Sequence, residues 1–209
     1  MATQHIHLYL AHALSDWEIG YAIANLNQPA FQKQPGRYSV RTVGPTLEPV
    51  TTMGGLRIVP DLALAELSAE RSALLILPGS DAYEAGKEHA ILEKAKAFER
   101  AGVPIAAICG ATAGLARIGL LDSRKHTSNA LEYLTYQPGY GGAANYRDAK
   151  AVSDQGVITA GATAPLDFAR EIFVALDAYE KPVLDAWYGL HSTGEARYYH
   201  ALMQAAAHN

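Results

Sequence analysis

The only cysteine of the 209-residue chain, Cys109, lies where a thiol can act as a nucleophile. A short apolar run, 103–108, precedes it, and the small residues Gly110 and Ala111 follow it at the start of a helix-like pattern. A strand that turns directly into a helix holds its side chain at the carboxyl edge of a sheet, as a nucleophile elbow does. The helix N-terminus favours the thiolate. The sequence therefore predicts a reactive Cys109; the alternative is a buried structural cysteine.

Strand patterns and helix patterns alternate along the rest of the chain. This alternation predicts an α/β fold: a mostly parallel, doubly wound (flavodoxin-like) sheet with helices on both faces and a nucleophile elbow. Residues 1–209 are expected to form a single domain, with 182–209 as a C-terminal helical extension. Strands are expected at 6–11, 38–43, 73–77, 103–108 and 157–160, a hairpin at 50–59, and helices at 16–26, 61–67, 82–100, 110–119 and 163–176.

Ligands bind such sheets beyond the carboxyl ends of the strands. Three loops are expected there: residues 12–18 after the first strand, the turn after Leu77, and the turn at Cys109. A thiolate that attacks a carbonyl needs an acid or base nearby and N–H donors for the oxyanion. The main-chain N–H of Gly110 is one candidate donor. His12, at the end of the first strand, is a candidate base, although a lone histidine is more often structural.

Composition limits the classes of partner. Hydrophobic residues make up 49% of the chain and charged residues 18%, which is typical of an ordinary globular protein. The formal net charge of −4, without clustered Lys or Arg, predicts no nucleic-acid partner, and no segment is long and apolar enough to predict a membrane partner. A single cysteine fits a reducing cytoplasm. No residue spacing indicates a metal site, and no cofactor is expected.

The run Ala-Ile-Cys-Gly-Ala-Thr at 107–112, with Leu-Leu-Ile-Leu-Pro-Gly-Ser at 74–80, resembles the ThiJ/PfpI superfamily. These are intracellular proteins with the class I glutamine amidotransferase-like fold, and the order of elements matches from His5 to about Tyr179. The resemblance implies a cysteine hydrolase or amidase, protease-like, that acts on a small molecule through Cys109, and a homodimer. Two alternatives stay open. One is glyoxalase-like or isonitrile-hydratase-like chemistry, and the other is a non-catalytic redox or stress protein in which Cys109 is oxidised to sulfinate.

The resemblance also assigns two partners to Cys109. Glu18 matches the family position whose carboxyl group hydrogen-bonds the nucleophilic sulfur; from its place alone it is equally an acid that favours a helix dipole. Ser80 takes the last position of the family's Pro-Gly-Gly turn, whose main-chain N–H is expected to complete the oxyanion hole with that of Gly110.

The base is where this chain departs from the resemblance, so the triad is incomplete. Many relatives have Thr-Thr-His after the elbow helix, whereas this chain has Thr-Ser-Asn at 127–129, with His126 three residues early. In an extended segment side chains alternate, which predicts that Asn129 faces Cys109 and His126 faces away. A bulge that rotates His126 toward the sulfur is the alternative. Without a histidine base, we expect little general peptidase activity.

Overall fold

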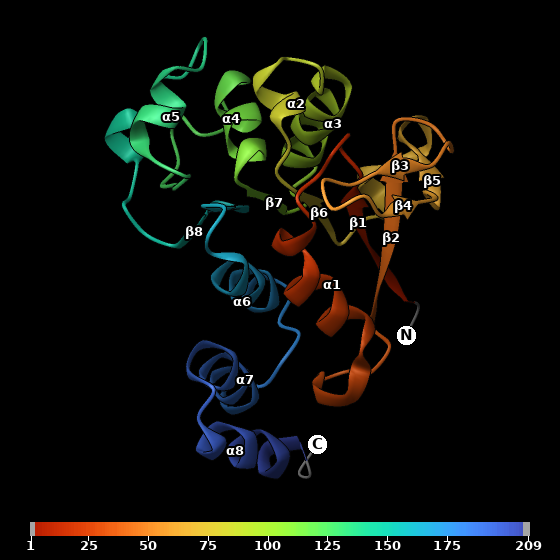
Figure 1. The fold of residues 1–209 in the computed structure, drawn as a ribbon, viewed down its shortest axis with the longest axis vertical. Helices are drawn as coiled ribbons and strands as arrows, with labels where there is room; N and C mark the ends of the chain where they lie inside the picture. The colour runs from red at the N-terminus through yellow and green to blue at the C-terminus, as the bar shows by residue number, and fades with distance from the viewer. Residues whose placement is uncertain (1–2, 207–209) are drawn as a thin grey trace.

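The computed structural model describes residues 3–206, which form a seven-stranded sheet with helices on both faces (Figure 1). The predicted α/β class is therefore confirmed. The strands of the sheet are β1 (Gln4–Tyr9), β2 (Tyr38–Gly44), β5 (Leu62–Ala63), β6 (Leu74–Leu77), β7 (Ile105–Ile108), β8 (Ala151–Asp154) and β9 (Val157–Ala160).

The strand order is β5-β2-β1-β6-β7-β9-β8, and every pair is parallel except β8 with β9. Without the two edge strands this is the flavodoxin-like order, whose topological switch point lies between β1 and β6. A small hairpin of β3 (Val50–Thr51) and β4 (Arg57–Ile58) stands beside the sheet. The carboxyl ends of β1, β6 and β7 therefore meet at the edge where ligands are expected to bind.

Two layers of helices cover the sheet. Helices α2, α3 and α4 lie on one face and α1 and α6 on the other, with α7 and α8 stacked beyond α6 (Figure 1). The helices are α1 (Gly20–Asn27), α2 (Asp81–Glu84), α3 (His89–Arg100), α4 (Gly110–Arg117), α5 (Leu131–Thr135), α6 (Pro165–Ala175), α7 (Lys181–Thr193) and α8 (Ala196–Ala206).

The central strands are buried along their whole length. Every residue of β6, β7 and β9 is buried, because helices cover both faces. Continuous apolar runs such as Leu-Leu-Ile-Leu in β6 are typical of parallel strands in this position. The core thus fixes the strand ends that carry the candidate site residues.

Two predicted elements differ from the structure, and one observed strand was not predicted. The helix expected at 82–100 is interrupted after α2, where Gly86 has a left-handed φ of 68° and Glu88 turns inward to accept a hydrogen bond from Tyr9. The helix expected at 61–67 is the edge strand β5 followed by 3₁₀ turns. The antiparallel edge strand β8 was not predicted, since its four residues have little periodicity of their own.

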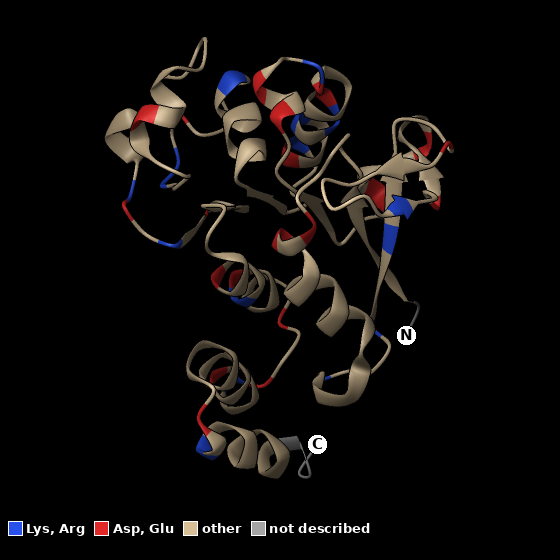
Figure 2. Ribbon diagram, in the orientation of Figure 1, with Lys and Arg blue, Asp and Glu red and all other residues tan. Residues whose placement is uncertain are grey.

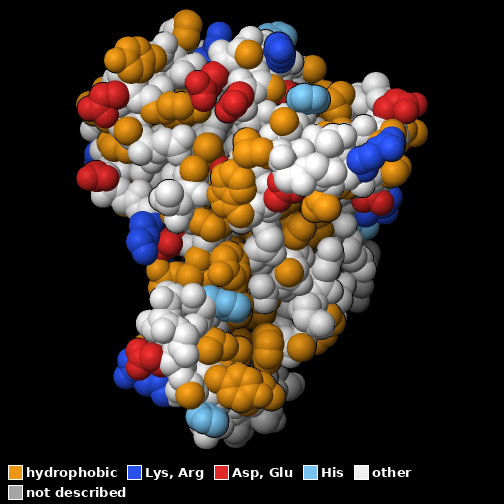
Figure 3. Space-filling view, viewed as in Figure 1, with side chains coloured by type: hydrophobic (Ala, Val, Ile, Leu, Met, Phe, Trp, Pro, Cys, Tyr) orange, Lys and Arg blue, Asp and Glu red, His pale blue; other side chains and the backbone are white. Residues whose placement is uncertain are grey.

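The surface mixes charge signs and leaves apolar side chains exposed. Acidic and basic residues are interspersed along the ribbon (Figure 2), and apolar side chains are spread over the face in Figure 3, including the region of α7 and α8. Tyr199 and Met203 of α8 are about half exposed. Among residues 3–206, no helix has the length and apolar character that crossing a bilayer requires.

Candidate active site

Cys109 occupies a strained turn between β7 and α4. Its φ of 56° and ψ of −124° are unusual for a residue with a side chain, and α4 begins at the next residue, Gly110. A Cβ at position 110 would lie 2.5 Å from the carbonyl oxygen of Ser80, so only glycine fits this close approach. This is the elbow geometry that the sequence predicts, and it holds the half-buried thiol at the carboxyl edge of the sheet.

Glu18 is buried beside the thiol. It ends a 3₁₀ turn, Asp16–Glu18, in the loop after β1, and its carboxyl group interacts with the Cys109 thiol. Its Oε2 accepts a hydrogen bond from the Gly79 main-chain N–H at 2.6 Å. Its Oε1 is buried and has no hydrogen-bond partner among residues 3–206. A proton shared with the sulfur would satisfy that oxygen.

The hairpin β3–β4 holds this loop in place. The carboxylate of Asp16 accepts a hydrogen bond of 2.6 Å from the main-chain N–H of Gly54, and the N–H of Met53 donates to the Leu14 carbonyl at 2.9 Å. These contacts flank Glu18 in sequence. They hold the loop that carries Glu18 in one position, and so place its carboxyl group beside the thiol.

The Glu18–Cys109 pair resists a second negative charge. Burial and the nearby Glu18 carboxylate raise the pKa of the Cys109 thiol to about 11, although hydrogen bonds from Asn129 and Gly110 oppose the shift. Burial also raises the pKa of Glu18. Desolvation and the like charge of Glu18 thus oppose the stabilisation of the thiolate that is expected from the helix N-terminus.

Asn129 lies on the sulfur side of its segment. Its Nδ2 donates to the sulfur of Cys109 at 3.5 Å, and its Oδ1 accepts from the Ala162 main-chain N–H at 2.9 Å. Trp17 also holds Ala162, since its Nε1 donates to the Ala162 carbonyl at 3.3 Å. The Asn129 amide is thus oriented toward the thiol by a residue that is itself fixed.

His126 points elsewhere. Its Nε2 is 2.7 Å from the hydroxyl of Tyr140, and its Nδ1 is 2.7 Å from the carbonyl oxygen of Arg124. The ring is fully buried, and burial lowers its pKa. Since both ring nitrogens have other partners, the structure does not bring His126 to Cys109, and no bulge rotates it there. The alternation of the segment places Asn129 and His126 as the sequence predicts.

Ser80 fits the turn without strain. Its φ of −164° and ψ of 144° are extended, which any residue adopts, and its main chain touches that of Gly110. The Ser80 hydroxyl caps α2 by accepting from the Ala82 N–H at 3.1 Å, and it donates to the main-chain carbonyl of His12 at 2.6 Å. The main-chain N–H groups of Ser80 and Gly110 therefore lie on adjoining turns, beside the thiol. The His12 side chain is exposed.

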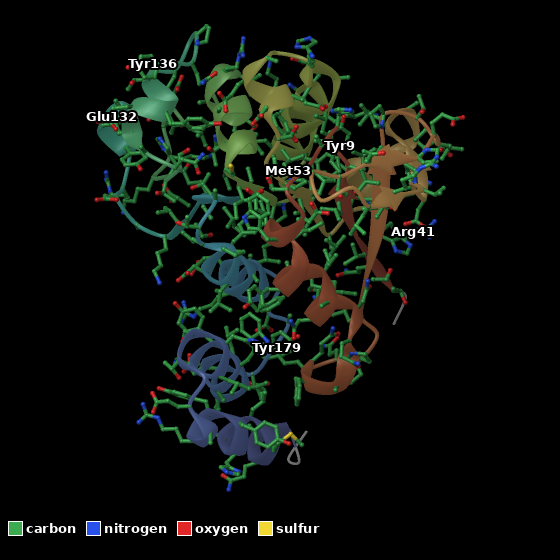
Figure 4. All side chains as sticks on the ribbon, viewed as in Figure 1. Tyr9, Arg41, Met53, Glu132, Tyr136 and Tyr179 are labelled. Atoms are coloured by element: carbon green, nitrogen blue, oxygen red, sulfur yellow. The ribbon has the colours of Figure 1, made fainter. Side chains whose placement is uncertain are left out.

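Two hollows flank the thiol. The larger, about 720 Å³, has Ser80 and His12 in its wall, together with Tyr9 and Met53 (Figure 4). The other, about 470 Å³, has Asn129 in its wall. Cys109 lines neither; it lies between Ser80 on one side and Asn129 on the other. A small molecule in the first hollow would contact Ser80, and one in the second would contact Asn129.

The sequence reasoning missed Tyr133 and Thr112. The Tyr133 hydroxyl of α5 donates to the Glu84 carboxylate, and burial, Glu84 and Cys109 raise the pKa of Tyr133. Thr112 hydrogen-bonds the Cys109 carbonyl at 2.6 Å. Thr112 lies in the quoted motif, which was a signal for it, whereas nothing local marks Tyr133. Within the described residues, no group of three His, Cys, Asp or Glu side chains gathers as metal ligands do.

A thiol elbow at the carboxyl edge of a flavodoxin-like sheet, paired with a buried carboxyl group, defines a class of α/β cysteine proteins. The chain belongs to the DJ-1/PfpI family, whose model matches residues 4–175. The resemblance to the ThiJ/PfpI superfamily is thereby confirmed.

Similar proteins support this membership over the whole chain. The uncharacterized protease YoaZ of Bacillus subtilis is 43% identical over 205 residues, 97% of this chain and 98% of that protein. The crystal structure of a thiJ/pfpI family protein from Bacillus anthracis is 44% identical, with a TM-score of 0.92 over 98% of both chains. The glutathione-independent glyoxalase DJR-1.2 of Caenorhabditis elegans is 29% identical, covering 70% of this chain and 77% of that protein.

Proposed function

We propose that this protein is a cysteine hydrolase, or amidase, that acts on a small carbonyl substrate through Cys109. One observation carries the proposal: the thiol lies at the elbow against a buried carboxyl group, Glu18, whose pKa is raised by burial. The relatives named as proteases are consistent with hydrolysis. The reaction needs a nucleophile, a proton carrier and oxyanion donors, and this edge offers all three.

In the proposed reaction the sulfur of Cys109 attacks the carbonyl carbon, and the proton of the pair is left on Glu18. The main-chain N–H groups of Gly110 and Ser80 donate to the oxyanion. Collapse of the adduct breaks the carbon–nitrogen bond, and Glu18 gives its proton to the leaving amine. Water then attacks the thioester, Glu18 accepts a proton from it, and the acid leaves with the thiol restored.

The absence of a histidine at the sulfur favours small substrates. Asn129 can orient a polar group but cannot take up and return a proton near neutral pH, and His126 is bound to Tyr140. Glu18 alone must carry the proton at both stages. We therefore expect reactive amides, esters or related small carbonyl compounds to be substrates, and little turnover of folded or peptide substrates.

A glyoxalase-like reaction is the second candidate. It needs only a thiol to add to an α-oxoaldehyde and one carboxylate to move the proton between the two carbons, after which water releases the hydroxy acid. The Glu18–Cys109 pair has those two groups, and the glyoxalase DJR-1.2 is a relative. The net reaction adds one water and requires no external oxidant.

A substrate screen separates these functions. Small amides, esters, dicarbonyls and isonitriles are offered to the wild type, to Cys109→Ala and to Glu18→Gln, with His89→Gln at an exposed histidine as the matched control. We expect hydrolysis of an amide or ester that both site variants lose and the control keeps. Turnover of dicarbonyls alone favours the second candidate. No turnover, with stoichiometric oxidation of Cys109 by peroxide, contradicts both and favours a redox sensor.

We also propose that the protein is a homodimer through an apolar surface. Tyr199 and Met203 of α8 are both about half exposed, and apolar side chains gather in the region of α7 and α8 (Figure 3). Exposed apolar groups that gather on one face are a feature of association surfaces. Light scattering at micromolar concentration is expected to give twice the chain mass, and a monomeric mass would contradict the proposal.

A further inference from the structure

A smaller cavity of about 170 Å³ lies at the opposite end of β1 from the elbow. His5 and His7 are in its wall and precede Tyr9 by four and two residues, so the three side chains share one face of β1. The remaining wall comes from β2, β5 and the 3₁₀ turns that follow β5. Residues lining it are His5, His7, Arg41, Leu62, Glu66, Ser68 and Arg71.

The side chain of His7 is almost fully buried, at 3% exposure, and its ring lines this cavity. Its Nδ1 is 2.7 Å from the Ser72 hydroxyl, and that hydroxyl gives its single proton to the Ser68 carbonyl. Ser72 must therefore accept, so Nδ1 carries the ring proton. The Nε2 atom is then the ring nitrogen without a proton, and the ring is part of the cavity wall.

Two guanidinium groups lie at the same cavity. The Nη2 of Arg71 is fixed at 2.8 Å from the Glu66 carbonyl, which leaves other N–H groups of Arg71 unused by that bond. The Nε of Arg41, on β2 (Figure 4), is buried without a hydrogen-bond partner, since its 4.0 Å approach to Asp61 is too long for one.

The nearby carboxylates are engaged elsewhere. Asp61 accepts from the N–H of Thr42 at 2.7 Å, and Glu66 accepts from the N–H of Ala63 at 3.0 Å. Burial, His5, Arg41 and Arg71 together lower the pKa of His7 to about 4. The Nε of Arg41 thus remains a donor without an acceptor at this cavity, and a bound anion could accept a hydrogen bond from it.

We propose that this cavity binds one small tetrahedral oxyanion, of the sulfate or phosphate type, and that His7 takes up a proton with it. A volume of about 170 Å³ equals roughly five water molecules, which suits a single oxyanion and is too small for a nucleotide. Guanidinium groups bind such oxygens in paired hydrogen bonds. The protonated Nε2 of His7 adds a third donor from the floor of the cavity.

Calorimetry with sulfate tests the proposal, since sulfate stays fully ionised and its charge does not change between pH 5.5 and 7.5. The wild type is expected to bind it more tightly at the lower pH. Arg41→Gln and Arg71→Gln are each expected to weaken binding at least about tenfold. Arg100→Gln, an exposed arginine at the end of α3, makes the same change in net charge and is expected to bind as the wild type does.

Parallel titrations define the ligand and the proton. Inorganic phosphate is expected to compete with sulfate, and whichever binds more tightly is the preferred member of the class. An NMR titration of the His7 ring in the wild type is expected to move to higher pH when sulfate is present. That readout does not depend on whether a His7 variant folds.

Three results would overturn the assignment. The first is no saturable binding of sulfate or phosphate at millimolar concentration. The second is wild-type binding by both Arg41→Gln and Arg71→Gln, or an equal loss in Arg100→Gln, which would make the effect one of net charge. The third is acetate binding as tightly as sulfate, or a His7 titration that sulfate leaves unchanged.

Discussion

The two ends of β1 bury titratable groups of opposite kind. At the carboxyl end Glu18 and Cys109 are acids, and burial raises the pKa of both; at the other end His7 is a base, and burial lowers its pKa. Desolvation is the first cause in all three cases, and it favours the neutral form of each group. The two ends differ in what surrounds the buried group.

The acidic pair has protein donors for one negative charge. The Gly79 N–H donates to Glu18, and the Asn129 amide donates to the sulfur, so either group of the pair has a donor for a negative charge. Around His7 the protein supplies the guanidinium groups of Arg41 and Arg71, which disfavour its protonation. One end of β1 is therefore arranged to transfer a proton, and the other to receive an anion.

Forcing the acidic pair apart should have the largest effect. In Gly79→Ala the new Cβ would lie 2.6 Å from Glu18 Oε2 and 2.7 Å from Cys109 Cβ, so the two groups must separate. We expect turnover of any substrate found in the screen to fall at least about a hundredfold, and stability to fall by about 1–3 kcal/mol. Steady-state kinetics and urea unfolding measure the two effects.

Gly20→Ala is the matched control for Gly79→Ala. A Cβ at Gly20, in α1, meets nothing within 4 Å, so activity and stability are expected to stay near the wild-type values. If Gly79→Ala folds and retains full turnover, close contact between Glu18 and Cys109 is not needed, and the proton-sharing account is wrong.

Removing the charge of Glu18 should lower the pKa of Cys109. In Glu18→Gln the carboxylate that disfavours the thiolate is gone, so the thiol should titrate below the wild-type value of about 11, by about one to two pH units. Thiolate absorbance against pH measures this directly. An unchanged titration would mean that burial alone sets the pKa of Cys109, and the comparison between the two ends would lose its coupled pair.

Local sequence predicted the parts of the fold and site that local chemistry decides. The buried run 103–108, the small residues after Cys109 and the Gly stop at 102 all lie within a few residues of what they determine. The sides on which Asn129 and His126 face agree with the alternation of an extended segment, once the family resemblance assigns position 129 to the side of the thiol. The place of Glu18 came from the family resemblance, since an acid in a first helical turn has several uses.

Long-range contacts account for what the sequence could not predict. The break in the helix at 85–88 is stabilised by Glu88 bonding Tyr9, 79 residues away. The bond of Tyr133 to Glu84 spans 49 residues. The raised pKa of Cys109 depends on burial, which no motif encodes. The basic cavity joins residues of three separate segments, so its charge was not visible in the order of the chain.

The buried His7 should make the protein less stable in acid. The pKa of His7 is 6.5 in the unfolded chain and about 4 in the fold, so the folded state binds fewer protons between these values. Its contribution to stability is full above pH 6.5 and is lost as the pH falls through 4. Urea unfolding should show about 2 kcal/mol more loss between pH 7 and 4.5 in the wild type than in His7→Gln.

His89→Gln, at an exposed histidine, is expected to follow the wild type across this range. Sulfate should flatten the acid loss of the wild type, because a bound anion lets His7 be protonated in the fold. If His7→Gln and the wild type lose stability in parallel, His7 is not the group that distinguishes this end of β1.

The smallest effect is expected at Asn129, whose amide lies at the margin of the acidic pair. Its 3.5 Å contact with the sulfur lowers the pKa of Cys109, and Asn129→Ala removes that donor. The thiolate fraction at pH 8, and with it the rate of alkylation by iodoacetamide, should fall about threefold. Asn145→Ala is the control, since its amide bonds the Asp122 carbonyl instead. A hundredfold fall in the alkylation rate would mean that Asn129, rather than Glu18, is the main determinant of the reactivity of Cys109. A rate equal to that of the control would mean that Gly79 and Gly110 supply all the donors that the pair needs.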